Sequence, residues 1–278
     1  MKIGFIGLGN MATAIIGGLL REDTTLNSED GNATVITAAN IIGSAKTEAT
    51  RQKRAEQFGI AVTASNREVA EAADVLVLAV KPQFFPEVIA EIRDAVSENT
   101  LVISIAAGLT LERIAGLFDR NVTAMRLIRC MPNTPALVNA GCTAVVPGPG
   151  ATEADEALCL RLMESFGRAI VIPERLMDAA SATAGSSPAF VFMFVEALAD
   201  GAVAAGMPRA QAYEFAAAAV AGSAQLVLET GRHPGDLKDM VCSPGGTTIE
   251  GVRALEEGAF RASVMNAISA CVEKAKAL

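Results

Sequence analysis

The chain has 278 residues, of which 51% are hydrophobic and 19% charged, a composition typical of a globular protein long enough for two domains. Its net charge of −8 argues against a nucleic acid or an anionic membrane as a partner, because both would be repelled. The five cysteines are odd in number and show no paired spacing, which indicates a reduced, cytoplasmic protein rather than a disulfide framework or a zinc site.

Short β-branched segments alternate with helical patterns through the first 173 residues. The expected strands are Lys2–Ile6, Thr34–Ala39, Val75–Val80, Leu101–Ile105, Val122–Leu127, Thr143–Val146 and Ala169–Ile172. Met11, Ile15 and Leu19, at a spacing of four, are typical of the helices between them. This alternation predicts a parallel sheet with helices on both faces, and we assign residues 1–173 to one α/β domain.

The remaining residues, 174–278, show no strand pattern and are expected to be helical. The segment Ala189–Ala199 is apolar on nearly every face, so it must be surrounded on all sides. Neither this segment nor Phe215–Leu228 reaches the roughly 20 apolar residues of a membrane span. An Ala-rich helical domain makes only a thin core by itself. We therefore predict a dimer, with a monomer that buries the helix internally as the alternative.

A glycine-rich turn at Gly7–Ala12 follows the first expected strand and opens a helix, in the form Gly-x-Gly-x-x-Ala. Gly7 permits the tight turn, Gly9 lets the main chain approach a pyrophosphate, and Ala12 lets helix and strand pack closely. The N–H groups at the helix start then attract the anion. A glycine turn without a ligand is the alternative, but this context favours a dinucleotide-binding site.

The end of the expected second strand carries Asn40, where NAD-specific sites usually carry an acidic residue. Lys46, Arg51, Lys53 and Arg54 follow it. Without a carboxylate to repel it, a 2′-phosphate can bind, and nearby cations favour it. We therefore predict NADPH as the preferred cofactor and NADH as a possible one. The basic residues can equally form the solvated face of a helix.

Two further strand ends, Ala79–Pro82 and Ser104–Gly108, are expected at the carboxyl edge, where open α/β sheets bind their ligands. Small residues there let a flat nicotinamide lie against the main chain. We interpret Lys81 as a cofactor contact, with a catalytic acid as the alternative.

Acid–base groups with catalytic spacing are scarce in this sequence. His233, the only histidine, stands in a turn and is expected to be structural, with a role as proton donor as the alternative. The sequence shows no nucleophile set and no metal-ligand spacing. Hydride transfer to an already protonated substrate fits this pattern, because the cofactor carries the chemistry.

A second helix start shaped for an anion lies within Cys242–Val252. Gly245 and Gly246 free the main chain to expose N–H groups near Gly246 and Thr247, and two threonine hydroxyls follow. A substrate carboxylate would fit there. The alternative is that Thr248 only caps the helix.

Five segments, spread over essentially the whole chain, resemble the motif series of pyrroline-5-carboxylate reductases. They are Phe5–Ala12, Ala79–Pro82, Arg129–Ala136, Gly185–Phe190 and Leu237–Thr248, of which the last is the most specific. The resemblance implies reduction of the cyclic imine 1-pyrroline-5-carboxylate to L-proline, the last step of proline biosynthesis, by hydride transfer from NADPH or NADH. It also implies a Rossmann-type α/β domain followed by an all-α dimerisation and substrate-binding domain, which we place at residues 174–278.

Site residues follow from the motifs and the resemblance together. We expect the cofactor to be bound by Ile6, Gly7, Leu8, Gly9, Asn10, Met11, Asn40, Asn66, Ala79, Val80, Lys81, Pro82, Ala106, Ala107 and Pro188, the last beside the nicotinamide. We expect the substrate to be bound by Ser243, Gly245, Gly246, Thr247 and Thr248, with the Thr248 hydroxyl facing the imine nitrogen as the catalytic group.

The chain departs from the family pattern at two positions: Phe190 stands where the family often has tyrosine, and Met240 where a polar residue is frequent. Two rival functions stay open. Another Rossmann oxidoreductase, such as an imine reductase or a β-hydroxyacid dehydrogenase, is the first, although the latter uses a lysine early in its second domain and this chain has none from residue 174 to 237. A non-catalytic dinucleotide-sensing protein is the second, but it would need no loop such as Ser243–Thr248.

Overall fold

The computed structural model describes residues 1–21, 25–27 and 33–276, which fall into two compact units. Unit 1 comprises Met1–Gly185 together with the chain end from Lys274, and unit 2 comprises Ser186–Glu273.

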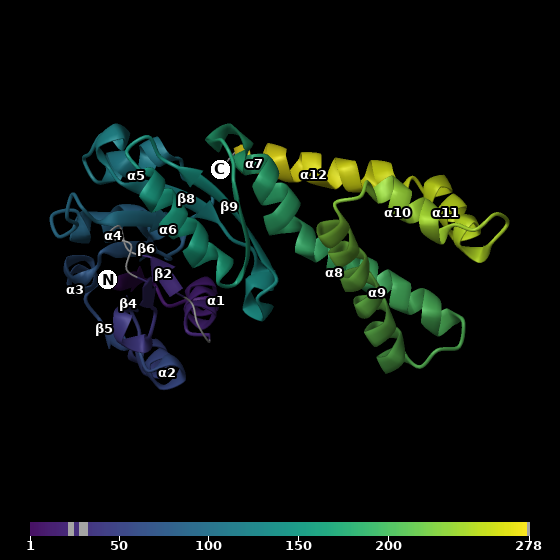
Figure 1. The fold of residues 1–278 in the computed structure, drawn as a ribbon, viewed down its shortest axis with the longest axis horizontal. Helices are drawn as coiled ribbons and strands as arrows, with labels where there is room; N and C mark the ends of the chain where they lie inside the picture. Colours follow the sequence, from purple (N-terminus) through teal and green to yellow (C-terminus); the bar gives the residue numbers. More distant parts are fainter. Residues whose placement is uncertain (22–24, 28–32, 277–278) are drawn as a thin grey trace. The chain divides into compact units, whose positions relative to one another are not determined.

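An eight-stranded sheet forms the centre of unit 1 (Figure 1). Its strands are β1 (Ile3–Ile6), β4 (Ile41–Ser44), β5 (Ala61–Thr63), β6 (Val75–Leu78), β7 (Leu101–Ser104), β8 (Leu127–Met131), β9 (Gly141–Pro147) and β10 (Gly167–Val171). They lie in the order β10-β9-β8-β7-β6-β1-β4-β5, and all neighbours are parallel except β8 and β9. Because the chain moves outward from β1 to β5 and then returns to β6 on the other side of β1, a ligand crevice is expected at the carboxyl ends of these strands.

Helices cover both faces of this sheet. They are α1 (Asn10–Leu19), α2 (Glu48–Phe58), α3 (Asn66–Ala72), α4 (Phe85–Ile92), α5 (Leu111–Leu117), α6 (Glu153–Glu164) and α7 (Met177–Ala180). Short 3-10 helices are η1 (Ala38–Asn40), η2 (Pro82–Phe84), η3 (Val122–Ala124), η4 (Thr134–Val138) and η5 (Glu174–Leu176), and η6 (Ser181–Ser186) is a π-helical turn. A separate antiparallel pair, β2 (Thr25–Asn27) and β3 (Ala33–Val35), completes the unit.

Two hydrophobic cores lie in unit 1, one on each face of the sheet. Phe5 of β1 packs into a core shared with α1 and α6, whereas Ile6 packs into a core shared with α3, α4 and α5. Successive side chains of a strand point to opposite faces, so the apolar strands supply both cores. The predicted α/β fold with a helical region after it is confirmed.

The second parallel strand was predicted at the wrong place. The expected strand Thr34–Ala39 does not continue to its predicted end. Residues 38–40 form a 3-10 turn instead, closed by the bond from the Thr37 N–H to Asn40 Oδ1 (3.0 Å). The strand that pairs with β1 is Ile41–Ser44. Gly43 interrupts its apolar pattern, and a Cβ atom there would lie 2.6 Å from a methyl carbon of Leu8, so the Leu8 side chain would have to shift to accommodate any other residue.

The expected strand Val122–Leu127 was also placed too early. Asn121 accepts a bond from the Thr123 N–H (2.9 Å) and so begins the 3-10 turn η3, and β8 starts only at Leu127. The short strand Ala61–Thr63 was not predicted at all, because three residues carry no periodicity.

The contacts of unit 1 extend to Gly185. Arg129 on β8 is 7% exposed and bonds Glu174 (Nη1 to Oε1, 3.0 Å), and Glu174 also accepts the Leu111 N–H (2.9 Å). Met177 is buried in the core beneath α4 and α5. These contacts join residues 174–185 to the sheet, and the sequence pattern does not reveal them.

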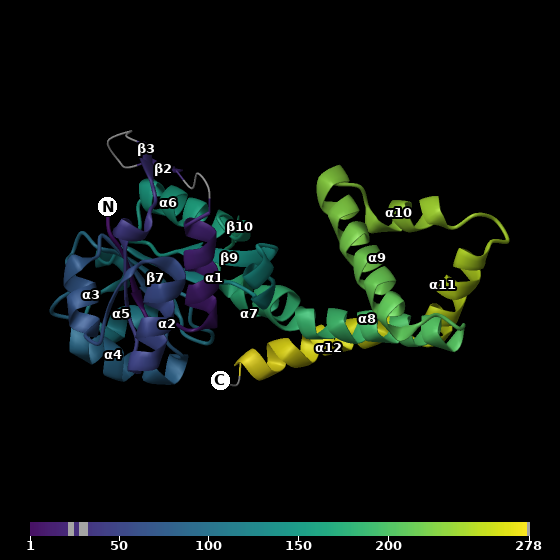
Figure 2. The ribbon, with the colours of Figure 1, turned by 90° about the horizontal axis from the view of Figure 1, so that it is seen from below.

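Unit 2 consists of helices only: α8 (Ser187–Ala204), α9 (Arg209–Thr230), α10 (Pro234–Val241), α11 (Thr247–Glu257) and α12 (Phe260–Lys276) (Figure 2). Its buried core is a small cluster of three alanines, Ala199, Ala212 and Ala216, between α8 and α9. On α9 the Arg209 guanidinium lies 5.4 Å from the ring centre of Tyr213, in a cation–π contact.

Residues 174–204 form one helical segment of 31 residues that is long and apolar enough, by length and composition alone, to cross a membrane. The expected apolar segment Ala189–Ala199 lies within it. Core helices of soluble proteins meet the same criterion, so the length by itself does not assign a membrane. Most of this apolar helix surface is not buried within the chain.

Candidate active site

The turn after β1 has the geometry that the fingerprint predicted. Gly7 has φ +96°, and a Cβ atom there would lie 2.9 Å from the Ala79 carbonyl oxygen, so only glycine fits this close approach to the end of β6. Gly9 faces open space, and Ala12 is buried in the core. The main chain at Gly9 is therefore open to a ligand, while Ala12 packs the helix on the sheet.

The start of α1 presents free donors at this turn. Gly9 is the N-cap residue, and no side chain caps the helix or adds an acid to its first turn. The N–H groups of Asn10 and Met11 therefore keep their hydrogen-bonding capacity for an anion, which the helix dipole also favours. Leu8 and Ile6 complete this turn as buried packing residues.

The ends of β6 and β7 lie at the same edge of the sheet as this turn, because β1, β6 and β7 are parallel neighbours. Ala79 and Val80 follow β6 directly and are half-buried, and Lys81 is exposed at the start of η2, with Pro82 in its first turn. After β7, Ala106 is buried and its N–H donates to Ser104 Oγ (3.3 Å), whereas Ala107 is exposed.

The end of β4 brings Asn66 to this edge as well. Ser44, the last residue of β4, is fully buried and its hydroxyl donates to Asn66 Oδ1 (2.7 Å), while the Asn66 amide donates to Glu91 (2.7 Å). These bonds fix the Asn66 side chain beside the expected dinucleotide edge.

A guanidinium group also lies after β4. Arg51 on α2 donates from Nη1 to the carbonyl oxygens of Ala45 (2.8 Å) and Lys46 (3.2 Å). Arg54 donates to the carbonyl of Leu8 (3.3 Å), in the glycine turn itself. Of the basic residues expected to favour a 2′-phosphate, Arg51 contacts the main chain just after β4 and Arg54 contacts the glycine turn.

Asn40 lies at the opposite edge. It precedes β4 instead of ending a strand, its Oδ1 accepts the Thr37 N–H, and its amide donates to the Met1 carbonyl (3.1 Å). Because parallel β1 and β4 both start there, Asn40 caps a turn at their amino ends and does not lie with the other predicted cofactor residues. Our placement of Asn40 rested on the wrong strand.

The loop Ser243–Thr248 of unit 2 forms a tight turn followed by a helix start. The Gly246 N–H donates to the Ser243 carbonyl (3.0 Å) across Pro244 and Gly245, and Gly245 has φ +66°, the pattern of a type II β-turn. A Cβ atom on Gly246 would lie 2.3 Å from Ser243 Oγ, so a side chain there would displace the Ser243 hydroxyl. The turn therefore uses the Gly246 N–H that we had expected to face the ligand.

Helix α11 begins at Thr247, directly after this turn, with Gly246 as its N-cap and no side-chain cap bond. The first N–H groups of a helix have no intrahelical partner, so those of Thr247 and Thr248 are available to a ligand. Thr248 is exposed and lies inside the first turn. The helix therefore gives no support to the alternative in which the Thr248 hydroxyl serves as its cap.

Other groups with reactive chemistry have structural roles. His233 caps α10, where its Nδ1 accepts the Gly235 N–H (3.0 Å), in line with the structural role that we predicted. The Cys130 and Cys159 sulfur atoms lie 3.5 Å apart in the core, and hydrogen bonding to Cys130 together with burial raises the pKa of Cys159, which keeps it a thiol. Among the described residues, no group of three His, Cys, Asp or Glu side chains lies close enough to hold a metal ion.

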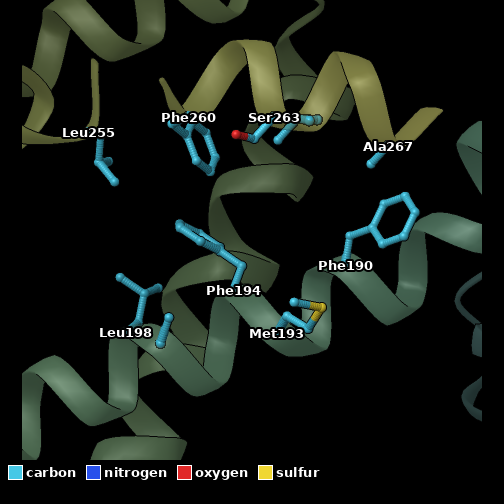
Figure 3. A pocket seen from close by; sticks show the side chains of 10 residues that line it. Phe190, Met193, Phe194, Leu198, Leu255, Phe260, Ser263 and Ala267 are labelled. Carbon is cyan, nitrogen blue, oxygen red and sulfur yellow. The ribbon is translucent and has the colours of Figure 1, made fainter. Parts of the chain in front are cut away.

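An apolar pocket of about 570 Å³ lies between α8, α11 and α12 within unit 2 (Figure 3). Phe194 of α8 and Phe260 at the start of α12 face each other in it, with ring centres 5.8 Å apart. Met193, on the same wall, is 68% exposed. A pocket with this lining is expected to be covered by other apolar side chains.

Comparison with known proteins decides the family. The chain is 50% identical to the pyrroline-5-carboxylate reductase of Escherichia coli K12 over 277 residues, which cover 100% of this chain and 98% of the relative. The chain belongs to the pyrroline-5-carboxylate reductase family. It is therefore an oxidoreductase, and the resemblance inferred from the motifs is confirmed. Residues 174–278 match the family model of pyrroline-5-carboxylate reductase dimerisation, and residues 2–108 match that of coenzyme F420-dependent NADP oxidoreductases.

Solved structures agree with this assignment. A pyrroline-5-carboxylate reductase from Coxiella burnetii matches with a TM-score of 0.88 at 34% identity, covering 99% of this chain and 97% of that one. The enzyme from Plasmodium falciparum, solved with NADP bound, matches with a TM-score of 0.81 at 29% identity, covering 100% and 97%. The dimerisation match over 174–278 confirms self-association.

Proposed function

We propose that this chain binds 1-pyrroline-5-carboxylate at the loop Ser243–Thr248 and reduces it to L-proline with a hydride from NADPH bound at the turn Ile6–Met11. The observation that carries the substrate site is the free helix start at Thr247 and Thr248, held by a type II turn next to an exposed hydroxyl. The reductase family supports the reaction, and the NADP-bound Plasmodium relative supports the cofactor class.

In this proposal the Thr247 and Thr248 N–H groups bind the substrate carboxylate, and the Thr248 hydroxyl bonds the nitrogen of the C=N group. The substrate nitrogen enters already protonated. When bound, NADPH would supply a hydride to the C=N carbon, and the C=N π electrons would become the lone pair of a secondary amine. The protein supplies position, because hydride transfer demands that the two carbons be held in contact.

The test of this site is the pair Thr248→Ala and Thr248→Ser. Loss of one positioned hydrogen bond to the reacting group should lower kcat/KM by roughly ten- to a thousandfold in the alanine variant. The serine variant should recover much of the loss, because it restores the hydroxyl. Steady-state kinetics with NADPH and the cyclic imine, together with melting temperature, measure both effects.

NADPH affinity should barely change in either variant, since Thr248 would contact the substrate alone. An alanine variant that melts earlier yet turns over at the wild-type rate would remove Thr248 from the catalytic residues. Wild-type enzyme inactive with the imine but active with a hydroxyacid and NAD would favour the rival dehydrogenase.

For cofactor choice we propose that Arg51 and Lys46 favour NADPH over NADH. The Arg51 guanidinium lies against the carbonyl oxygens that end β4, where Rossmann enzymes bind the ribose, and no carboxylate follows β4 until Glu48. A 2′-phosphate there would gain charge-assisted bonds from the guanidinium. Asn40 lies at the amino ends of β1 and β4, so a substitution there would not test this site.

Ala45→Asp should instead shift the ratio of kcat/KM values towards NADH, through repulsion of the phosphate, and Arg51→Gln should lower kcat/KM with NADPH by about tenfold with little effect on NADH. Lys53→Gln, on the same helix and exposed, is the matched control and should leave the ratio unchanged. Equal use of both cofactors by the wild-type enzyme, unaltered in Arg51→Gln, would refute the assignment.

We also propose that the protein works in a reducing cytoplasm. All five cysteines, each among the described residues, are free thiols.

A further inference from the structure

Glu91 on α4 contacts one of the expected cofactor residues, yet the site described so far gives it no task. Its Oε2 accepts a hydrogen bond from Nδ2 of Asn66 (2.7 Å). The Asn66 Oδ1 accepts in turn from the hydroxyl of Ser44 (2.7 Å), which is fully buried. The Ser44 carbonyl accepts the Gly7 N–H (3.0 Å). A continuous series of hydrogen bonds therefore runs, within unit 1, from the glycine turn to Glu91.

The main chain at Asn66 is held by bonds of its own. Ser65 is the N-cap residue of α3 and accepts the Glu68 N–H (3.1 Å), and the Thr63 hydroxyl accepts the Ser65 N–H (3.1 Å). These bonds fix the Asn66 Cα atom where β5 passes into α3. The freedom that remains lies in the side-chain torsions, and its largest step is the half turn that exchanges the amide oxygen and nitrogen.

Glu91 decides between the two orientations of this amide. An ionised carboxylate only accepts hydrogen bonds, so the Asn66 nitrogen must face Glu91 and the oxygen must face Ser44. The Ser44 hydroxyl can donate or accept, and it therefore fits either orientation. A hydrogen bond to an ionised group is also about twice as strong as one between neutral groups. The bond to Glu91 is thus the one that selects the observed orientation.

The hydrogen-bonding groups that Asn66 retains match a hydroxyl. Its bonds to Ser44 and Glu91 use one N–H and one oxygen lone pair, so one of each is left for a ligand. A ribose hydroxyl both donates and accepts. Ser44 is the last residue of β4, and Rossmann domains bind the adenosine ribose at the end of the strand that follows the glycine turn.

Asn66 and Arg51 approach this strand end from opposite faces of the sheet. Helix α2, which carries Arg51, packs through Phe58 against the core of α1 and α6, whereas α3 packs through Val69 into the core on the other face. The proposed 2′-phosphate contact belongs to Arg51. Asn66 is therefore left for the part of the ribose that NADPH and NADH share.

We infer that Glu91 is a positioning residue for the cofactor: it holds the Asn66 amide in one orientation and so fixes the N–H and the lone pair that bond a hydroxyl of the adenosine ribose. The inference rests on the proposed function for the class of cofactor, but not for the imine. By charge alone Glu91 opposes dinucleotide binding, because the pyrophosphate has the same sign. Removal of Glu91 therefore tightens binding if only its charge acts, and weakens binding if it positions Asn66.

The experiment measures the dissociation constants of NADPH and NADH by titration without substrate. Glu91→Ala should raise both constants by about three- to tenfold, the scale of one hydrogen bond between neutral groups. Their ratio should stay the same, in contrast to Arg51→Gln, and kcat at saturating cofactor should stay close to wild type. Glu91→Gln should have a smaller effect, since its amide can still accept. Glu87→Ala, also exposed on α4, is the matched control and should weaken neither cofactor.

A double-mutant comparison shows whether Glu91 acts through Asn66. Asn66→Ala should raise both constants at least as much as Glu91→Ala does, and the double variant should resemble Asn66→Ala alone. Unchanged or tighter binding in Glu91→Ala would overturn the inference, and so would an equal rise with and without Asn66. A merely structural role lowers the melting temperature and leaves the constants of the folded variants unchanged.

Failure of this inference can be told apart from failure of the proposed function. A wild-type enzyme that binds NADPH but does not reduce the imine refutes the proposed reaction, while the titrations still decide the role of Glu91. A wild-type enzyme that binds neither cofactor overturns both.

Discussion

The two units of this protein bury their apolar residues in different ways. Unit 1 encloses its large side chains in two cores, and Phe5, Phe85 and Phe166 are each less than 2% exposed. Among its described residues, unit 2 buries only three alanines and Leu237, while Phe192, Met193 and Phe215 are each about two-thirds exposed. A domain that completes its core within one chain can fold by itself, whereas one that leaves such residues open needs a partner.

The two proposed binding sites lie in different units. The dinucleotide turn, with its packed glycine and buried alanine, lies in the unit that needs no partner. The proposed substrate loop Ser243–Thr248 lies in the unit that does. We therefore expect cofactor binding to survive the loss of self-association and imine reduction to be lost with it.

The largest effect is expected from Met193→Asp, which should break the association of unit 2. Burial of a methionine side chain contributes about 2 kcal/mol to the free energy of association, and a symmetric dimer contains this contribution twice. Burial of an unpaired carboxylate in its place would cost more still. Light scattering should show a monomer, imine reduction should be lost, and NADPH binding should persist.

Phe84→Asp is the matched control, since Phe84 is 47% exposed in the self-sufficient unit. It should leave the mass of the assembly unchanged. A Met193→Asp variant that keeps both mass and activity would contradict the division drawn between the units.

A smaller effect is expected when the ion pair Arg126–Asp155 is removed. This change tests how far unit 1 is stabilised by contacts within itself. Asp155 is 1% exposed, and although burial would raise its pKa, hydrogen bonds from Arg126 (Nε to Oδ2, 3.0 Å) and Thr152 lower it. Asp155→Asn should cost about 2 kcal/mol of unfolding free energy at neutral pH.

The sign of its pH dependence follows from the lowered pKa. The stabilisation is fully present above the ordinary carboxyl pKa of about 3.9 and is lost as the pH falls through the lower folded value. Urea unfolding of wild type and Asp155→Asn should therefore converge in acid. Asp119→Asn, which removes an exposed pair with Arg93, should cost less than about 1 kcal/mol at any pH.

The smallest effect is expected at Thr143 of β9. Its side chain is fully buried and its hydroxyl has no hydrogen-bond partner in the part of the chain that the structure describes. Thr143→Val should leave the stability of unit 1 within about 1 kcal/mol of wild type or raise it, because an unpaired buried hydroxyl is costly.

Thr100→Val provides the contrast, since the Thr100 hydroxyl donates to the Ala73 carbonyl (3.3 Å) in a buried place. It should destabilise by about 1 kcal/mol. Calorimetric melting of both variants measures the difference, and equal losses in the two would show that Thr143 has a partner after all.

Sequence reasoning succeeded where chemistry is local. The turn at Gly7–Ala12 needs a positive φ, an open main chain and a small buried residue within six positions, so the letters alone predict its form. The turn at Ser243–Gly246 could be anticipated in the same way, since Pro and Gly at its centre are the residues that a type II turn demands.

The failures came from contacts between distant residues. Asn40 was assigned to the cofactor because Gly43 hides the true strand, and glycine stands there to accommodate Leu8 from another turn. The bond from Asn133 to Ala184 spans 51 positions, and no local pattern announces it. Arg51 was named among the basic residues after Asn40, and the structure adds its bonds to the carbonyl oxygens of Ala45 and Lys46.

Tyr213 gives the partner-dependent unit a natural optical probe. It is the only tyrosine of a chain without tryptophan, and it lies on α9 with its ring under Arg209. Ultraviolet emission from the unmodified protein therefore originates from one side chain in unit 2, and unit 1 contributes only weak phenylalanine signals. Dilution or unfolding of the helical half can be followed in native enzyme without a label, while circular dichroism of the same sample reports on both halves.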